Sequence, residues 1–226
     1  NMESVPDLTI KSPANGTVEV NMNLAALSGA SDQSTITVSG TGAGLDIAYT
    51  DDGVAATAAS SVLETVEVVS QSVANTINDL QLDAVGTTTL KISGDKSLTI
   101  STATDATVAV IDGSASTGGF TLAGIGFASP TVMGGAGADT ITAVGGGATE
   151  SYSMGGGNDS VDFANGFTGT DVYDGGDGVD TLIIGTDGFS NAGTASTIAA
   201  GLSNVEVLSL TAVSYTHLRA HETVDY

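Results

Sequence analysis

Three aspartates recur at a nearly constant distance behind glycine clusters in residues 134–184. Asp139, Asp159 and Asp180 each follow a glycine-rich run and are followed by a hydroxyl-bearing residue and then an apolar one. Glycine permits positive backbone φ, so a short turn can direct its carbonyl oxygens inward, and the aspartate adds a carboxylate to them. A flexible cage of many oxygen ligands suits Ca²⁺ better than Mg²⁺. The spacing therefore predicts turns lined by oxygen atoms, an environment that suits Ca²⁺.

The aspartates occupy the sixth position of a nine-residue unit, G-G-x-G-x-D-x-U-x, in which U is apolar. Residues 134–142 (GGAGADTIT) and 175–183 (GGDGVDTLI) match this unit at every defined position. Residues 154–162 (MGGGNDSVD) depart from it only at the first position.

Two degraded units lie between the intact ones. Residues 145–153 carry Glu150 in the acidic position and residues 166–174 carry Asp171, but each unit lacks a glycine. Because two units complete one coil, the intact units are expected to stack along one edge and the degraded units along the other. The apolar position should belong to a short strand and point into the core. It is filled in all five units, by Ile141, Tyr152, Val161, Tyr173 and Leu182.

This pattern resembles the repeats-in-toxin calcium-binding β-roll family over residues 134–184. The resemblance implies that each ion lies between two stacked turns, held by sixth-position carboxylates and backbone carbonyls. It places one site between Asp139 and Asp159 and a second between Asp159 and Asp180. A weaker third site would join Glu150 and Asp171. The carbonyl ligands that it implies are those of Gly134, Ala136, Ala138, Met154, Gly156, Asn158, Gly175, Asp177 and Val179. The alternative is a glycine-rich solenoid that stacks without metal.

Upstream of these turns, short runs rich in Thr, Val, Ile and Leu recur between Gly, Ser and Asp, as in residues 87–94 and 96–102. Such runs without hairpin dipeptides favour a parallel solenoid over a sandwich. We therefore predict an all-β, elongated, right-handed parallel β-solenoid in which a β-helix runs into a calcium-binding β-roll. Its predicted segments are the end of a preceding β-rich module (1–40), a β-helix-like segment (41–133), the β-roll (134–184), a short helix with a terminal strand (185–212) and an artefactual tail (213–226).

Two local patterns nearer the N-terminus carry further predictions. The dipeptide Asn15-Gly16 is typical of hairpins and indicates an antiparallel module ending there. Residues 42–49 and 63–70 resemble residues 176–183 and 202–209, roughly 135 positions later, which favours a large module repeated in tandem. In that alignment Asp46 is the counterpart of Asp180 and a candidate for another calcium turn.

The charge balance points to a cationic partner. The chain has 26 Asp and Glu against 4 Lys and Arg, a formal net charge of −22, and no cysteine. Such a surface repels nucleic acid and anionic membranes, and the compact chain repels itself unless cations sit among the carboxylates. No apolar run approaches membrane-spanning length. The first residues have no signal-peptide pattern, and because the chain opens with Asn it is expected to be a fragment.

Both histidines and the only arginine lie in the C-terminal tail, residues 213–226. Residues 213–223 resemble the translation of a transposase adaptor used in sequencing libraries, so we set this tail aside. The rest of the chain has no His, Arg or Cys, and we therefore expect no enzyme. The catalytic alternative is an enzyme that acts on acidic polysaccharides through Asp51, Asp52 and the acids of residues 171–180.

The Leu-x-x-Val-Glu-Val strands together with the nonapeptides resemble bacterial surface-layer proteins and large surface proteins exported by type I secretion. This resemblance implies an unfolded chain in calcium-poor cytosol that folds outside on binding Ca²⁺. We predict a calcium-dependent structural segment of a secreted bacterial surface-layer or adhesin-like protein, located at the extracellular cell surface. Copies of itself in a lattice or array and cell-surface polysaccharide are the candidate partners. The alternative is a non-catalytic export and folding module of a type I-secreted enzyme or toxin.

Three aromatic residues near the repeats allow two interpretations. Tyr152, Tyr173 and Phe167 could form a carbohydrate-binding stripe. Core packing is the favoured interpretation, because the two tyrosines occupy the apolar position of their units.

Overall fold

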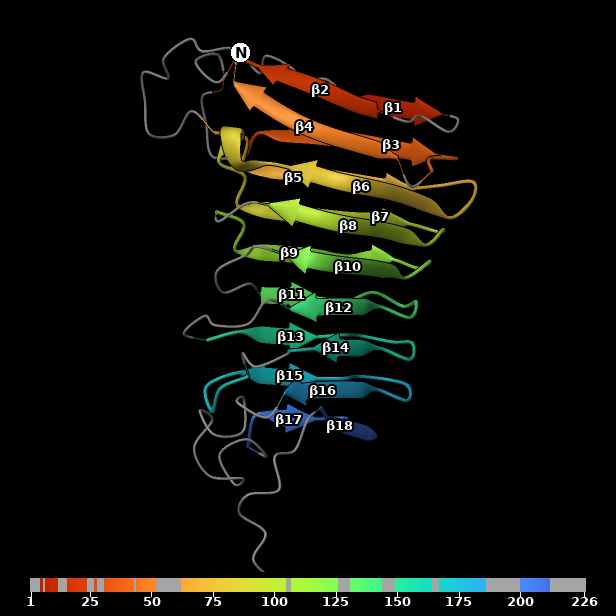
Figure 1. Cartoon of the computed structure of the whole chain (residues 1–226), viewed down its shortest axis with the longest axis vertical. Coiled ribbons are helices and arrows are strands. Elements are labelled where there is room, and N and C mark those ends of the chain that lie inside the picture. The colour runs from red at the N-terminus through yellow and green to blue at the C-terminus, as the bar shows by residue number, and fades with distance from the viewer. Residues whose placement is uncertain are drawn as a thin grey trace, which may run out of the picture.

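The described residues of the chain form two parallel β-sheets of nine strands each, and successive strands alternate between the sheets (Figure 1). The computed structural model describes residues 7–11, 16–23, 31–42, 44–51, 62–104, 107–125, 131–143, 149–163, 167–185 and 200–211, together with Val5 and Leu27. Each coil gives one strand to each sheet, and strands from successive coils pair in parallel. The predicted all-β, elongated parallel solenoid is confirmed.

The odd-numbered strands form one sheet, here called the odd sheet, in sequence order. Its members are β1 (Leu8–Lys11), β3 (Gln33–Ser39), β5 (Thr65–Ser70), β7 (Thr89–Gly94), β9 (Val110–Ser116), β11 (Thr131–Met133), β13 (Ser151–Ser153), β15 (Val172–Asp174) and β17 (Leu202–Ser203).

The even-numbered strands form the opposite sheet, here called the even sheet. Its members are β2 (Gly16–Met22), β4 (Leu45–Asp51), β6 (Asn75–Gln81), β8 (Leu98–Thr104), β10 (Phe120–Ile125), β12 (Thr140–Ala143), β14 (Ser160–Asp162), β16 (Thr181–Gly185) and β18 (Val207–Thr211). A single 3-10 turn, η2 (Asp83–Val85), follows β6 in the described part of the chain.

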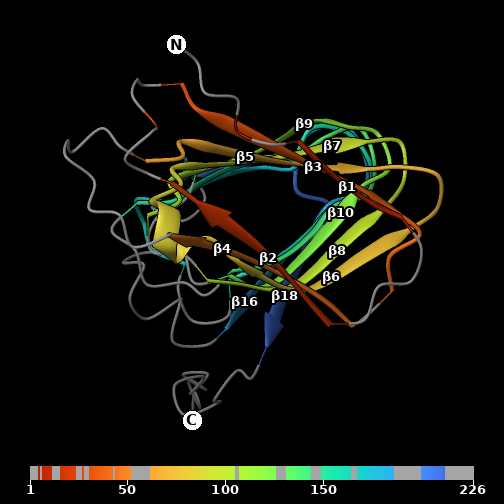
Figure 2. The same ribbon diagram turned by 90° about the horizontal axis from the view of Figure 1, so that it is seen from above.

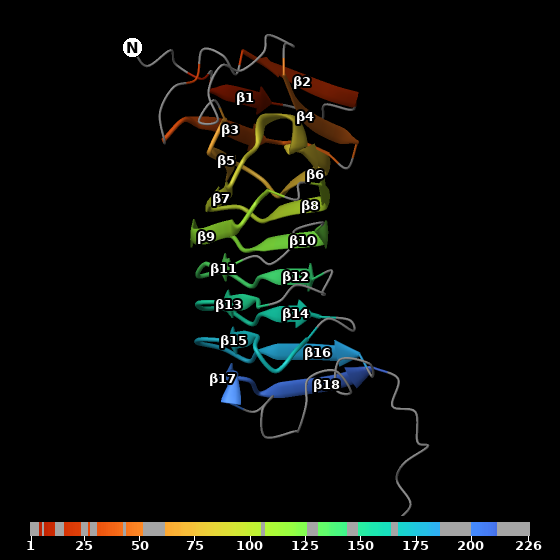
Figure 3. The ribbon, with the colours of Figure 1, turned by 90° about the vertical axis from the view of Figure 1, so that its left-hand side faces the viewer.

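The two sheets face each other around a narrow interior. Seen along the long axis, the odd strands line one side of the molecule and the even strands the other (Figure 2). From the side, the coils stack as successive levels, with β11 beside β12 and β13 beside β14 (Figure 3). The described turns that precede β12, β14 and β16 are stacked on one another, as the bonds from Gly156 N to Gly135 O and from Asp177 N to Gly155 O show.

The core follows from strict alternation along the strands. In β3 and β5, Ile36, Val38, Val66 and Val68 are fully buried, while the residues between them are partly exposed. Side chains alternate between the faces of a strand, so every second residue enters the interior. One apolar cluster extends from Ile10 to Ile184.

The five predicted core positions of the nonapeptides are all buried, with at most 1% of each side chain exposed. Strands β13, β14 and β15 have three residues each, so a nine-residue unit gives about a third of its length to a strand and the remainder to a turn. The shortness of these strands explains why one apolar residue per unit is enough to fill the interior.

The N-terminal strands belong to the same solenoid. Strands β1 and β2, which flank Asn15-Gly16, lie in different sheets and pair in parallel with β3 and β4. The predicted antiparallel hairpin module is therefore wrong for the described residues. Both sheets also continue through residues 40 and 133, where segment boundaries were predicted.

The similarity between residues 63–70 and 202–209 does not correspond to a structural repeat. The first segment leads into β5 of the odd sheet, whereas the second contains β17 of the odd sheet and begins β18 of the even sheet. The resemblance reflects the shared strand composition of the two segments.

The predicted terminal strand is present as β18. The predicted short helix and the C-terminal tail lie outside the described residues. Within the described residues, no helix has the length and apolar character needed to cross a bilayer.

Candidate metal centre

The three repeat aspartates lie in line at one edge of the even sheet. Asp139, Asp159 and Asp180 immediately precede β12, β14 and β16, and these strands pair in register. Residues that precede paired positions in stacked parallel strands are themselves neighbours. The three aspartates therefore form what we call the carboxylate column, as the repeat phase predicts.

Each member of the column bonds to the coil before it. The Oδ1 atom of Asp139 accepts a hydrogen bond from the Phe120 N–H at 2.8 Å. Asp159 Oδ1 accepts from the Asp139 N–H at 2.7 Å, and Asp180 Oδ1 accepts from the Asp159 N–H at 2.8 Å. One oxygen of every carboxylate is thus satisfied by a backbone donor.

The second oxygens differ along the column. All three side chains are buried, with at most 1% exposed. Asp139 Oδ2 accepts from the Gly135 N–H of its own turn at 2.8 Å. The Oδ2 atoms of Asp159 and Asp180 have no hydrogen-bond partner among the described residues. A buried polar atom without a partner is costly and rare, so these two oxygens mark places that need a cation or a proton.

Burial makes the charged forms of Asp139 and Asp159 unfavourable. Desolvation raises the pKa of Asp139 from 3.8 to about 6, although the Gly135 and Phe120 N–H groups oppose the rise. Desolvation also raises the pKa of Asp159, to about 7, with the neighbouring Asp139 and Asp180 carboxylates adding to it against the Asp139 N–H. A bound divalent cation would reverse this preference, because it favours the ionised form.

Backbone carbonyls of the next coil face the column. A Cβ added to Gly134 would contact both Met154 O and Asp139 Oδ2, and a Cβ added to Gly175 would contact both Asn204 O and Asp180 Oδ2. A carbonyl oxygen and a carboxylate oxygen thus border the same small space. Met154 is one of the predicted carbonyl ligands, whereas Asn204 lies outside the nonapeptide units.

The turns that hold these oxygens need glycine. Gly155 and Gly176 have φ of +88° and +89°, a conformation that other residues rarely adopt. A Cβ on Gly176 would lie far inside the contact distance of Gly155 O. The second and third intact turns thus share one backbone geometry and stack directly.

The predicted carbonyl ligands all lie in these three stacked turns. The carbonyl of Asp177 already accepts a hydrogen bond from the Gly157 N–H at 2.9 Å. Gly134, Met154 and Gly175 are buried, Gly156 is partly exposed, and Ala136, Ala138, Asn158, Asp177 and Val179 are exposed.

Within the described residues, no three His, Cys, Asp or Glu side chains are grouped as a metal site. The members of the column come one from each coil, so two neighbouring carboxylates border each gap. Ca²⁺ takes six to eight oxygen ligands, and backbone carbonyls and water count among them. A cation at the column would therefore need further oxygen ligands, from the turns and from water, to complete its coordination shell.

The opposite edge of the solenoid brings Glu150 and Asp171 together, as predicted, and both are buried. Asp171 Oδ1 accepts from the Glu150 N–H at 2.9 Å, and its Oδ2 accepts from the Thr168 N–H at 2.5 Å. Both oxygens of Asp171 therefore have backbone donors. This edge has less need of a cation than the carboxylate column.

Asp46 does not occupy a calcium turn. It is the second residue of β4, between the buried Leu45 and Ile47. Its Oδ1 accepts a hydrogen bond from Asn78 Nδ2 at 2.8 Å. Asp46 is partly exposed between two buried neighbours and so faces outward, whereas Asp180 is fully buried, so the two side chains point to opposite faces. The predicted equivalence of Asp46 and Asp180 is wrong.

The three aromatic residues of the repeats belong to the core. Tyr152, Tyr173 and Phe167 are at most 1% exposed, and Phe163 makes edge-to-face contacts with Tyr152 and Phe167 at centroid distances of 4.7 and 5.0 Å. Phe167 fills space in the core where an intact unit would have a glycine. Core packing is confirmed over the carbohydrate-binding stripe.

Asn75 lies in line with the carboxylate column in an earlier coil, and its role was not predicted from the sequence. It lies above Leu98 and Phe120 in the register of the even sheet. Its Oδ1 accepts from the N–H groups of Gly40 and Thr41 at 2.7 and 3.0 Å.

The amide of Asn75 satisfies its own turn. Its Nδ2 donates to Gln71 O at 3.1 Å and to Val73 O at 2.6 Å. Asn75 thus has a donating Nδ2 with two carbonyl partners where Asp159 and Asp180 have an Oδ2 atom without a partner. No local pattern in the sequence signals this role, because the bonds from Gly40 and Thr41 to Asn75 Oδ1 span coils.

Glu206 extends the column at its other end and was also missed. Its Oε2 accepts from the Asp180 N–H at 2.8 Å. The signal available in the sequence is an acidic residue directly before an apolar strand, 26 residues after Asp180.

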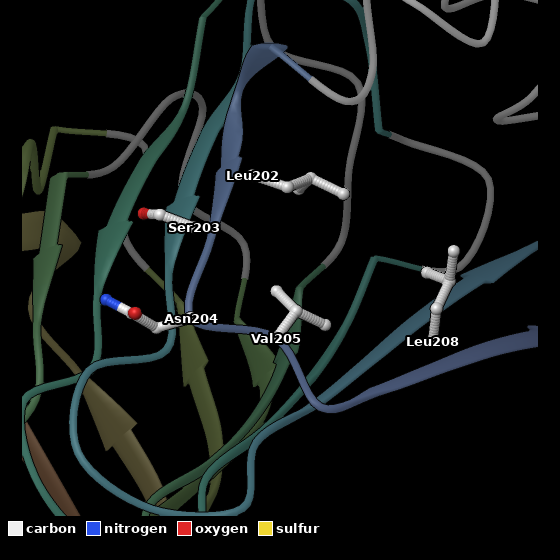
Figure 4. Close-up of a pocket in the computed structure, with 5 residues that line it drawn as sticks. All are labelled: Leu202, Ser203, Asn204, Val205 and Leu208. Atoms are coloured by element: carbon white, nitrogen blue, oxygen red, sulfur yellow. The ribbon is translucent and has the colours of Figure 1, made fainter.

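A cavity opens at the C-terminal end of the solenoid, beside this last turn. It has a volume of about 320 Å³ and is lined by Leu202, Ser203, Asn204, Val205 and Leu208 (Figure 4).

Comparison of the chain with protein-family models, with curated proteins and with solved structures gives no match, so the assignment of a function rests on the geometry of the column.

Proposed function

We propose that this chain is a calcium-dependent structural segment of an extracellular bacterial surface protein, of the surface-layer or adhesin-like kind. The observation that carries the proposal is the pair of buried, unpartnered oxygens, Asp159 Oδ2 and Asp180 Oδ2, on a column of aligned carboxylates. Both need a positive partner, and the surrounding groups offer oxygen ligands.

The residues that would hold the ions are those of the stacked turns. One ion would be shared by Asp139 and Asp159 with the Met154 carbonyl, and one by Asp159 and Asp180 with the Gly175 carbonyl. Bound Ca²⁺ supplies positive charge and tolerates irregular oxygen coordination. The protein's part is to stack the turns so that carboxylates and carbonyls from neighbouring coils face one gap.

Metal binding would then be coupled to folding. The oxygens come from separate coils, so the site does not exist in the unfolded chain, and the free energy of binding adds to that of folding. A formal charge of −22 opposes compaction until cations reduce it. Such a chain is suited to remaining incompletely folded where Ca²⁺ is scarce and to completing its fold where Ca²⁺ is abundant, as outside the cell.

A structural role fits the position of the acids better than catalysis does. The carboxylates of the column are buried between coils and bond to backbone N–H groups, which leaves them no access to a large substrate. The outward positions of β3 and β5 carry Thr and Glu, which suit contact with water, with neighbouring copies or with polysaccharide.

Circular dichroism and light scattering of the full chain, with Ca²⁺ and with chelator, test this proposal. We expect a β-sheet spectrum in Ca²⁺ that is weaker in chelator at pH 7.5 and melts at a lower temperature, and a matched Mg²⁺ sample that does not restore it. Particle growth that requires Ca²⁺ would support assembly of copies into an array. A β-sheet spectrum and melting temperature unchanged by chelator would identify a solenoid that stacks without metal and would overturn the proposal.

A further inference from the structure

Glu206 stands in line with the aspartates although it lies outside the nonapeptides. The pairing of β16 with β18 sets Asp180 beside Glu206. The Asp180 N–H donates to Glu206 Oε2 at 2.8 Å, the same bond that the Asp159 N–H makes to Asp180 Oδ1 at 2.8 Å. Glu206 is therefore the fourth carboxylate of the column.

The gap between Asp180 and Glu206 holds a second feature that points to a ligand. Asp180 is fully buried, and its Oδ2 has no hydrogen-bond partner among the described residues. The position of a Cβ on Gly175 would be in contact with both this oxygen and Asn204 O. A carboxylate oxygen and a carbonyl oxygen thus share one space.

The last turn is shaped to present its carbonyl. Asn204 has φ of +49°, a left-handed conformation that is uncommon outside glycine. Its Nδ2 donates to Asp174 Oδ1 at 2.7 Å, and Ser203 O accepts from the Gly175 N–H at 3.1 Å. These bonds hold the turn against the coil above and keep the Asn204 carbonyl beside Gly175.

The last turn is also shorter than the turn that it stacks on. Gly175 and Asp180 are five positions apart, whereas their partners in register, Asn204 and Glu206, are two apart. A shorter turn sets the backbone of its acidic residue differently, and the extra methylene of Glu allows its carboxylate to reach the Asp180 N–H.

We infer that Asp180, Glu206 and the Asn204 carbonyl form a further Ca²⁺ site at the C-terminal end of the column. The inference rests on the proposed function. Glu206 is exposed, unlike the aspartates above it, and the cavity lined by Asn204 and Val205 opens beside the turn (Figure 4). Water therefore completes the shell at this site, which binds more weakly than the interior sites and exchanges with solvent first.

The test is a Ca²⁺ titration of the full chain by equilibrium dialysis and calorimetry, comparing wild type with Glu206→Gln. We expect Glu206→Gln to weaken one Ca²⁺ site by about tenfold or more and to leave the tighter sites unchanged. Glu19→Gln, the same change at an exposed position of β2, is the matched control and should bind as wild type does. Asp180→Asn removes a ligand from two neighbouring gaps and should lose more binding than Glu206→Gln.

The outcomes separate this site from the proposed function. Wild type that binds Ca²⁺ together with an unaltered Glu206→Gln titration overturns the further site and leaves the proposed function standing. Wild type that binds no Ca²⁺ overturns both. Glu206→Asp keeps the charge but shortens the side chain, so it should weaken the same site, and it decides the question if Glu206→Gln does not fold by circular dichroism.

Discussion

Asn75 and Asp159 occupy equivalent positions of one column and differ by an amide for a carboxylate. The Asn75 amide donates to two carbonyls of its own turn, whereas Asp159 Oδ2 is buried without a partner. The aspartate turns therefore lack the hydrogen-bond donor that the Asn75 amide gives to its own turn. A proton or a cation must take the place of the amide hydrogens.

Replacing Asp159 with Asn should therefore make the metal-free protein more stable. With chelator at pH 8, we expect Asp159→Asn to raise the free energy of unfolding by about 1–3 kcal/mol, the usual cost of a buried unsatisfied group. Urea denaturation measures this change. Asp177→Asn removes the same charge from an exposed position in the next turn, and it should stay within about 0.5 kcal/mol of wild type. A less stable Asp159→Asn protein in chelator would contradict this reading of the column.

The raised pKa values predict how the metal-free protein responds to pH. In the folded chain the pKa of Asp139 is about 6 and that of Asp159 about 7, both above the ordinary value of 3.8. A raised carboxyl pKa stabilises the fold below the unfolded value and loses that contribution as pH rises through the folded value. Melting temperature in chelator should thus fall between pH 5 and pH 8.

Saturating Ca²⁺ should remove most of this pH dependence above pH 6, because the ion and the protons compete for the same oxygens. Thermal melts followed by circular dichroism, in parallel series with and without Ca²⁺, measure both curves. A metal-free melting temperature that rises over this range would show that the two aspartates are not buried as described.

At the scale of the elements, the repeat phase allowed the lower half of the solenoid to be predicted closely. Nine-residue spacing and period-two alternation are local, so the strands, their inward residues and the two edges could be derived from them. The runs at residues 87–94 and 96–102 likewise correspond to β7 and β8.

The failures have separate physical causes. The roles of Asn75 and Glu206 depend on register between coils, through bonds that span 35 and 26 residues, and no local pattern encodes that register. Asp46 was misplaced because a one-residue shift moves a side chain to the other face of a strand. The hairpin expected at Asn15-Gly16 was wrong because β1 and β2 lie in different sheets and each pairs in parallel with a later strand.

Turn glycines provide a test at this scale. Gly176→Ala places a Cβ at φ +89° against Gly155 O, so we expect a loss of about 1–2 kcal/mol from the backbone conformation and more from the clash. Gly42→Ala meets nothing within 4 Å and should be neutral or up to about 1 kcal/mol more stable. Chemical denaturation in Ca²⁺ compares the two. Equal effects would contradict the stacking of the turns.

At the scale of the whole molecule, the two halves of the solenoid have different residues at the position of the column. The upper half has Asn75, Leu98 and Phe120 in the column, whereas the lower half has Asp139, Asp159 and Asp180. Each coil of a solenoid contacts only its neighbours, so local stability follows local interactions. The upper half therefore has no carboxylate in the column that needs a cation.

Removal of Ca²⁺ should thus loosen the molecule unevenly. Hydrogen exchange followed by mass spectrometry should show lost protection in β12–β16 on chelation, while β5–β8 keep theirs. For each site, Ca²⁺ at about 100 times its Kd should add about 2.7 kcal/mol to stability. Uniform loss of protection from β5 to β16 would contradict the division.

The most direct measurement is an anomalous difference map from crystals of the full chain grown in Ca²⁺, collected at long wavelength. The account predicts calcium peaks in line along the column, within about 2.3–2.6 Å of Asp159 Oδ2 and of Asp180 Oδ2. A map without peaks at this edge, in which these oxygens bond to water or carry protons, would contradict it.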